Sequence, residues 1–114
     1  MANQETLIQR FWRHVFEKPT RPAFLVKNRG PVEQPILIGG GPMHAPHVYV
    51  PKREAYRPLS HMDAGILVAE IVTFLRQCGF KRGDKAAILA WNRPEWVWTD
   101  LAIQTMGGVT VPIY

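Results

Sequence analysis

The feature that most constrains the fold is a strand–helix–strand pattern near the end of the sequence. Lys85–Ala90 is a short apolar run, which is typical of a strand covered on both faces. Val109–Ile113 is a second such run, and a helical pattern separates the two. Short links of this kind predict a βαβ crossover between parallel strands. Two parallel strands cannot form a complete sheet, so the pattern predicts an α/β fold with an incomplete parallel sheet.

The helix inside this unit carries its own start and stop signals. We expect Asn92 to cap it, with Pro94 in the first turn and Glu95 at the third helical position. The paired glycines Gly107 and Gly108 are expected to end it. The apolar positions between these signals are Trp96, Val97, Trp98, Leu101, Ala102, Ile103 and Met106.

The first half of the chain predicts a helix and short strands. Gln4–Glu17 has the spacing of an amphipathic helix, which Pro19 ends. Ala23–Lys27 is a predicted strand. A β-hairpin or meander is expected from His47–Val50 and Tyr56–Leu59, with its turn at Lys52-Arg53-Glu54.

A long helix follows this hairpin. Ser60 and Asp63 match a capping box, and Gly79 is placed to end the helix as its C′ residue. One apolar stripe combines Leu67, Ile71, Phe74 and Cys78, and Ile66, Val68, Val72 and Leu75 widen it. Such a broad apolar surface predicts burial of this helix on more than one side. Because Cys78 lies in that stripe and no base is near it in sequence, we expect it to be a small core residue and not a nucleophile. A single cysteine also excludes an intramolecular disulfide.

Residues 28–46 form a predicted Pro/Gly-rich loop, in which Gly39-Gly40-Gly41 has the composition of a phosphate loop. A phosphate site needs a helix directly after the glycines, and Pro42–Pro46 cannot start one, so a turn is expected. The spacing of His44, His47 and His61 matches no helical pair of metal ligands.

Charge and targeting signals restrict the partners. The net charge is +5, but the basic residues are scattered, and the densest run, Lys52-Arg53 with Arg57, contains Glu54. We therefore expect a solvated surface and no nucleic-acid partner. The N-terminus resembles no signal peptide, and no apolar run approaches a membrane span, which favours a cytoplasmic protein. Peripheral membrane contact through the Gln4–Glu17 helix is the alternative to packing of that helix in the core.

Ligands of open α/β sheets collect beyond the carboxyl ends of the strands. Those ends are Trp91-Asn92 and Tyr114. These residues are candidates for the wall of a cleft, although structural roles are the more natural expectation. They include no nucleophile, metal ligand set or phosphate loop.

Three runs, taken in order, resemble one enzyme family. They are GDKAAILAWNRPEW (Gly83–Trp96), DLAI (Asp100–Ile103) and GGVTVPIY (Gly107–Tyr114). They are similar to the N-terminal part of the large domain of AMP-forming acyl-CoA synthetases, which are adenylate-forming enzymes. Arg21-Pro22-Ala23 and Tyr56–Ser60 are similar to earlier parts of the same domain. The ending Val-Pro-Ile-Tyr is most similar to the long-chain fatty acid–CoA ligase branch.

The resemblance implies a two-step ligase that joins a fatty acid to CoA through an acyl-adenylate, releasing AMP and diphosphate. ATP, Mg²⁺ and CoA are implied for the full-length enzyme. The family's phosphate loop, ribose-binding aspartate and catalytic lysine lie downstream of the matching region. We therefore assign no catalytic, cofactor-binding or metal residue to this chain. It is expected to be one partial domain, residues 1–114, inactive without the rest of the ligase.

A hypothesis of another class stays open. The same fold segment can serve as a freestanding, non-catalytic interaction module that binds a partner through its open sheet edge. A ligase fragment with that edge is instead expected to self-associate, so oligomeric state separates the two hypotheses.

Overall fold

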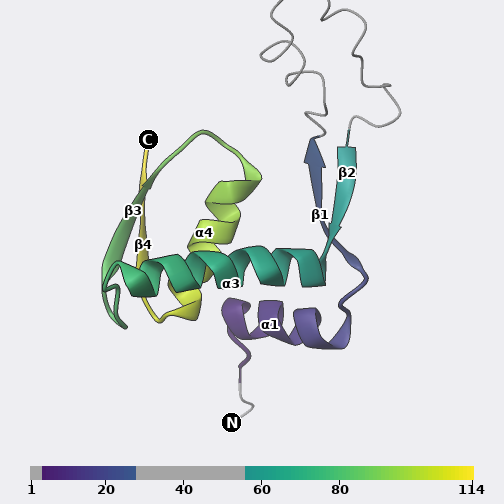
Figure 1. The fold of residues 1–114 in the computed structure, drawn as a ribbon, viewed down its shortest axis with the longest axis horizontal. Helices are drawn as coiled ribbons and strands as arrows, with labels where there is room; N and C mark the ends of the chain where they lie inside the picture. The colour runs from purple at the N-terminus through teal and green to yellow at the C-terminus, as the bar shows by residue number, and fades with distance from the viewer. Residues whose placement is uncertain (1–3, 28–55) are drawn as a thin grey trace, which may run out of the picture. The chain divides into compact units, whose positions relative to one another are not determined.

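The computed structural model describes residues 4–27 and 56–114. Their elements follow in the order α1, β1, β2, α3, β3, α4 and β4 (Figure 1). The predicted Pro/Gly-rich loop at residues 28–46 and the predicted strand His47–Val50 lie outside the described residues. By packing, the chain divides into a unit made of Met1–Phe24 with Ser60–Tyr114 and a second unit, Leu25–Leu59.

Helix α1, Leu7–Glu17, begins later than the sequence pattern predicts. Thr6 is its N-cap residue, and its hydroxyl accepts a hydrogen bond from the backbone N–H of Gln9 at 3.2 Å. The Gln9 side chain accepts from the backbone N–H of Thr6 at 2.9 Å. This reciprocal capping box satisfies two helix-end donors, so the helix starts at Leu7 instead of Gln4.

The strands β1, Pro22–Lys27, and β2, Tyr56–Ser60, pair in a two-stranded sheet. Both strands were predicted within one residue of their observed ends. The partner of β2 among the described residues is therefore β1.

Helix α3, His61–Gln77, has both of its predicted end signals. The Ser60 hydroxyl accepts from the backbone N–H of Asp63, and the Asp63 carboxylate accepts from that of Ser60, both at 3.0 Å. At the other end Gly79 has a φ of 84°, a left-handed conformation that favours glycine. The capping box and the C′ glycine are both confirmed.

The predicted core face of α3 is correct in part, because Val68 and Val72 are buried, but Phe74 and Cys78 are not. Its buried residues are Ala64, Gly65, Val68 and Val72, whereas Phe74 is 61% exposed. Cys78 is exposed at the C-cap instead of lying in the core. The reason is close packing. Small residues on α3 let α1 approach, so α3 buries the face that carries its small side chains instead of the stripe that carries its largest ones.

Strands β3, Lys85–Leu89, and β4, Val109–Ile113, are parallel neighbours, which confirms the βαβ prediction. Helix α4, Pro94–Thr105, connects them. Its N-cap is Arg93, with an extended backbone and no side-chain capping bond, so the prediction of Asn92 as the cap is wrong. The residue before a proline favours an extended backbone. With Pro94 at the first helical position, the cap therefore falls on Arg93.

The turn from α4 into β4 explains the paired glycines. Gly107 has a φ of 72°, and its carbonyl accepts a hydrogen bond from the N–H of Gly83 at 2.9 Å. A Cβ on Gly108 would lie 2.5 Å from the Phe80 ring and 3.0 Å from the Asp84 carbonyl oxygen. The first glycine is required by backbone conformation and the second by close packing.

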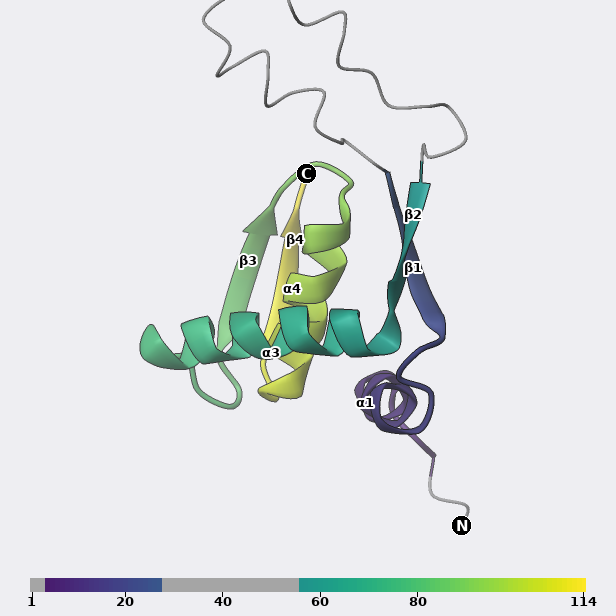
Figure 2. The same ribbon diagram turned by 45° about the vertical axis from the view of Figure 1, so that its right-hand side comes forward.

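The helices form the core with one face of the β3–β4 pair. Helix α4 packs against β4 and α3, and α1 packs against both α3 and α4 (Figures 1 and 2). The Trp12 indole N–H donates to the Thr105 hydroxyl at 2.9 Å and ties α1 to α4. The buried apolar side chains are Val15, Ala64, Val68, Val72, Ile88, Trp98, Leu101, Ala102 and Ile103.

We expect Gly65→Ala to destabilise this packing. A Cβ at Gly65 would lie 2.7 Å from Cγ1 of Val15, so α1 or α3 must shift. Overpacking of this kind costs about 1–3 kcal/mol, which exceeds the gain of up to about 1 kcal/mol from the better helix former. Chemical denaturation measures the change. In a Val15→Ala background Gly65→Ala should cost less than in the wild type, because the clash is removed. A Gly65→Ala variant more stable than the wild type would contradict the close contact.

Candidate functional site

The candidate site is the end of the sheet where β3 and β4 both finish. Leu89 lies beside Ile113 in the parallel register, so Trp91-Asn92 and Tyr114 follow neighbouring strand ends. The structure therefore brings these three predicted cleft-wall residues to one edge. Helix α4 starts at the same edge, after the turn that leaves β3 (Figure 2).

The side chains at this edge face solvent. Trp91 is 88% exposed, Tyr114 is fully exposed and Asn92 is exposed. Beside them the Arg93 guanidinium forms an ion pair with Glu95 at 3.2 Å. Two exposed aromatic side chains, an amide and a surface ion pair can line a cleft, but they supply neither a nucleophile nor a poised general base.

A polar cluster that sequence reasoning missed joins α4 to β4. The Thr110 hydroxyl donates to Oδ1 of Asp100 at 2.6 Å, and the Gln104 amide donates to Oδ2 at 3.0 Å. Asp100 and Gln104 have the i, i+4 spacing of a helical pair, which was the available signal. The half-buried carboxylate holds β4 in register against α4, so its role is to position the strand that carries Tyr114.

The described residues do not form a phosphate or metal site. Glycines with positive φ are Gly79, Gly83 and Gly107 in this part of the chain, and they precede strands instead of helices. They also lie before the start of β3 and β4, away from the carboxyl ends. Within residues 4–27 and 56–114, no group of three His, Cys, Asp or Glu side chains could hold a metal ion. The Gly39–Gly41 run lies outside these residues.

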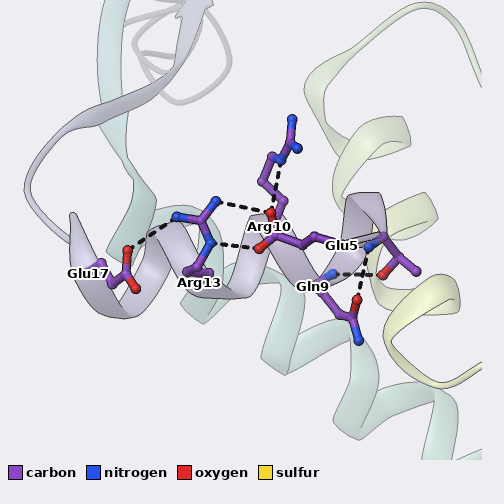
Figure 3. A network of polar contacts seen from close by, with 6 residues as sticks. Glu5, Gln9, Arg10, Arg13 and Glu17 are labelled. Carbon is purple, nitrogen blue, oxygen red and sulfur yellow. Dashed lines mark hydrogen bonds and ion pairs between the residues drawn. The ribbon is translucent and has the colours of Figure 1, made fainter. Parts of the chain in front are cut away.

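The polar face of α1 carries a network of ion pairs (Figure 3). Arg13 binds Glu5 at 2.6 Å and Glu17 at 3.3 Å, and Arg10 binds Glu5 at 3.2 Å. The hydrogen bond from Arg13 lowers the pKa of Glu5 to about 2. Because these groups are exposed, salt screens them and their contribution to stability is small.

The apolar face of α1 packs against the protein, as the core hypothesis predicts. Val15 at its centre is 3% exposed. The exposed apolar residues Leu7 and Phe16 are nine positions apart, which places them on opposite edges of that face. A helix lying on a membrane would instead expose the centre of its apolar face. In the part of the chain described here, no helix is long and apolar enough to cross a bilayer.

The histidines do not gather as ligands among the described residues. His61 lies at the start of α3, where its ring nitrogen Nδ1 is 3.0 Å from the Arg21 carbonyl oxygen. Its neighbour is the ring of His14, with the centroids 5.3 Å apart. His44 and His47 lie outside the described residues.

The face of the sheet that points away from the helices is apolar and exposed. Burial alternates along β3, with Ile88 buried and Leu89 75% exposed. On β4, Val109, Val111 and Ile113 are 50%, 41% and 45% exposed. Leu89, Val109, Val111 and Ile113 are called the outer sheet face below. Parallel sheets are normally covered on both faces, so this face is typical of one that packs against further structure.

A buried donor also lacks a partner. The indole N–H of Trp98 has no hydrogen-bond acceptor among the described residues, although the residue is only 8% exposed. Its ring packs edge-on against Phe24, with the centroids 6.2 Å apart. An unpaired buried donor costs about 1–3 kcal/mol, which is unusual in a complete core.

Sequence comparison decides the family. The family described as AMP-binding enzyme matches residues 33–114, which is most of the chain. The chain belongs to the AMP-binding enzyme family. A curated member of similar sequence is fatty acyl-CoA synthetase A of Dictyostelium discoideum, which is 38% identical over 63 residues. That match covers 55% of this chain and 9% of the relative.

Two solved ligase structures have a similar fold. A fatty acyl-adenylate ligase from L. pneumophila, solved with acyl adenylate and pyrophosphate, matches 98% of this chain with a TM-score of 0.69 and 15% identity. A putative long-chain-fatty-acid CoA ligase from Rhodopseudomonas palustris CGA009 matches 100% of it, with a TM-score of 0.65 and 21% identity. This chain corresponds to 16% and 22% of those chains. The predicted fold, the N-terminal part of an adenylate-forming enzyme, is confirmed.

Proposed function

We propose that the chain is the N-terminal structural segment of a long-chain fatty acid–CoA ligase. The observations that carry the proposal are the 38% identity to a fatty acyl-CoA synthetase over 63 residues and the AMP-binding enzyme match at residues 33–114. The reaction is ATP-dependent formation of a fatty acyl-CoA through an acyl-adenylate. The segment itself is a partial domain, residues 1–114, without catalytic residues, and the ligase acts in the cytoplasm.

An exposed apolar face and a buried, unpaired hydrogen-bond donor support a structural role for the segment. The outer sheet face exposes four large apolar side chains. The Trp98 indole N–H is buried without an acceptor among the described residues. Both are expected where a protein interior continues, and the partner that completes them in this proposal is the remainder of the ligase chain.

The residues described here do not fit ATP or Mg²⁺. The strand ends offer an exposed Arg93–Glu95 ion pair and no cluster of carboxylates, and the turn glycines precede strands. ATP, Mg²⁺ and CoA are therefore held by other parts of the ligase in this proposal. The contribution of the segment in this proposal is structural: Asp100 and the glycine turn fix β4, and the parallel pairing of β3 with β4 brings Trp91 and Tyr114 to one edge of the sheet.

The gene provides the first test. We would sequence the transcript past the codon for Tyr114 and express the complete encoded protein beside the 114-residue chain. The proposal predicts that the frame continues into a Ser/Thr/Gly-rich loop that contains a lysine. We expect fatty acid, ATP and CoA to give AMP and acyl-CoA with the complete protein. The 114-residue chain should give no signal above a buffer control.

Two results would contradict the proposal. AMP release by the 114-residue chain alone would show that it carries catalytic groups. A stop codon directly after Tyr114 would leave no ligase to complete, and the interaction-module hypothesis would replace the proposal. Size-exclusion chromatography then separates the two, because a fragment with an open edge self-associates and a module forms one defined species.

A further inference from the structure

A pair of histidines lies at the joint between α1 and α3. His14 is in the last turn of α1, and His61 is the first residue of α3. Their rings meet edge to face, with the centroids 5.3 Å apart and the planes at 89°. The two residues are 47 positions apart in the sequence, and each ring is half-buried. The contact therefore depends on the docking of one helix against the other.

The chain around this pair is fixed by hydrogen bonds to the turn that follows α1. The backbone N–H of His61 donates to the Arg21 carbonyl at 2.9 Å, and the His61 ring nitrogen Nδ1 lies 3.0 Å from the same oxygen. The N–H of Met62 donates to the Pro19 carbonyl at 3.0 Å. These bonds hold the ring of His61 in place, so His14 meets a rigid neighbour.

The surroundings of His14 disfavour a proton on its ring. Burial lowers the pKa of His14 from its usual 6.5, and the positive charges of Lys18, Arg13 and His61 lower it further. Glu5 acts in the opposite direction, but its carboxylate already binds Arg10 and Arg13. The end of α1 would favour a cation through the helix dipole. The net direction is nevertheless toward the neutral ring.

We propose that the His14–His61 contact is a proton-sensitive latch, which holds α1 on α3 while the His14 ring is neutral and loosens α1 when that ring takes up a proton. A proton on His14 is disfavoured in its half-buried position at the joint and is repelled by the positive charges of Lys18 and Arg13. The proposal stands on the geometry of the joint and does not depend on the ligase activity.

The direction of the pH dependence follows from proton linkage. The pKa of His14 is lower in the folded chain than the 6.5 of the unfolded chain. The unfolded chain therefore binds more protons below that value, and stability falls as the pH falls through about 6.5. The loss continues until the pH reaches the folded pKa. Glu5, with a pKa of about 2, titrates below this window.

The test compares stability at about pH 7.5 and about pH 5 by chemical denaturation, because histidine changes charge between these values. The wild-type chain should be less stable at about pH 5 than at about pH 7.5, because the pKa of His14 is lower in the folded chain than in the unfolded chain. His14→Gln should lose this pH dependence, since glutamine does not titrate. Residues outside the joint are the same in both proteins, so their contributions cancel in the comparison.

A second measurement keeps the proposal testable if His14→Gln does not fold. NMR titration of the imidazole Cε1 proton gives the pKa of His14 in the wild type and in His61→Gln. We expect a pKa below 6.5 in the wild type and a higher pKa in the variant, because one positive neighbour is removed. A His14 pKa at or above 6.5, an unchanged pKa in His61→Gln, or equal pH dependence in His14→Gln and wild type would overturn the latch.

Discussion

Alanine at Ile103 is expected to lower the free energy of unfolding by about 2–5 kcal/mol. Ile103 is fully buried in α4, the helix that packs against both α3 and β4. Removing its side chain takes away buried apolar contacts and leaves a cavity that the surrounding helices fill only in part. The total free energy of unfolding of a domain of this size is about 5–15 kcal/mol, so the variant should be close to unfolding. Urea denaturation monitored by tryptophan fluorescence measures the shift of the midpoint.

Ile66→Ala is the matched control, because it removes the same side chain from a helix. Ile66 lies on α3 and is 51% exposed. Substitutions at such exposed positions stay within about 0.5 kcal/mol. Equal losses in the two variants would show that α4 is not the centre of the core. Helix propensity favours alanine in both helices, so its effect on stability cancels when the two variants are compared.

The elements that sequence predicted well are those with local signals. Ser60 and Asp63 are three residues apart, and the capping box between them needs no other part of the chain. The turn at Gly107 requires a left-handed backbone, which glycine adopts most easily. Thr6 and Gln9 carried an equally local signal, which was missed because the apolar pattern was extended back to Gln4.

The N-cap of α4 was a local error with a local cause. Asn92 is a favourable capping residue by type, but Pro94 decides the register. A proline at the first helical position forces the residue before it to be extended, so Arg93 occupies the cap. Backbone geometry outweighed side-chain preference at this position.

The buried face of α3 could not be found from periodicity. Apolar residues surround most of that helix, so several stripes fit the pattern equally well. Gly65 decides the outcome, because it lies against Val15 of α1, far away in the sequence. Phe74 and Cys78 are exposed as a result. The same limit applies to the His14–His61 contact and to the Asp100–Thr110 bond, which arise only when distant elements pack.

At the candidate site, too, features with local signals were predictable, and features that depend on distant parts of the fold were not. Parallel pairing of β3 and β4 was predictable, and it places Trp91 and Tyr114 at one edge. The structure that covers this edge was not predictable from these residues, because the covering layer of a parallel sheet comes from other parts of the fold.

Aspartate at Val111 is expected to act differently in the chain and in the complete ligase. Val111 lies on the outer sheet face and is 41% exposed in the 114-residue chain. There the change costs up to about 1 kcal/mol, mainly through the low strand propensity of aspartate. In the complete ligase the proposal covers this face with further structure, and an unpaired carboxylate buried there costs several kcal/mol. We expect loss of soluble, active ligase, measured by yield and acyl-CoA formation.

Val111→Thr is the control, because it keeps the shape of the side chain and its strand preference without adding charge. It should leave the 114-residue chain unchanged and the ligase folded and active. If Val111→Asp is tolerated equally in both proteins, the outer sheet face stays exposed in the complete protein. The four exposed apolar residues would then need another partner, and the structural-segment proposal would fail at the observation that supports it. If the ligase alone loses its fold, the apolar face is an interior surface, and its exposure in the chain reflects the absence of the covering layer.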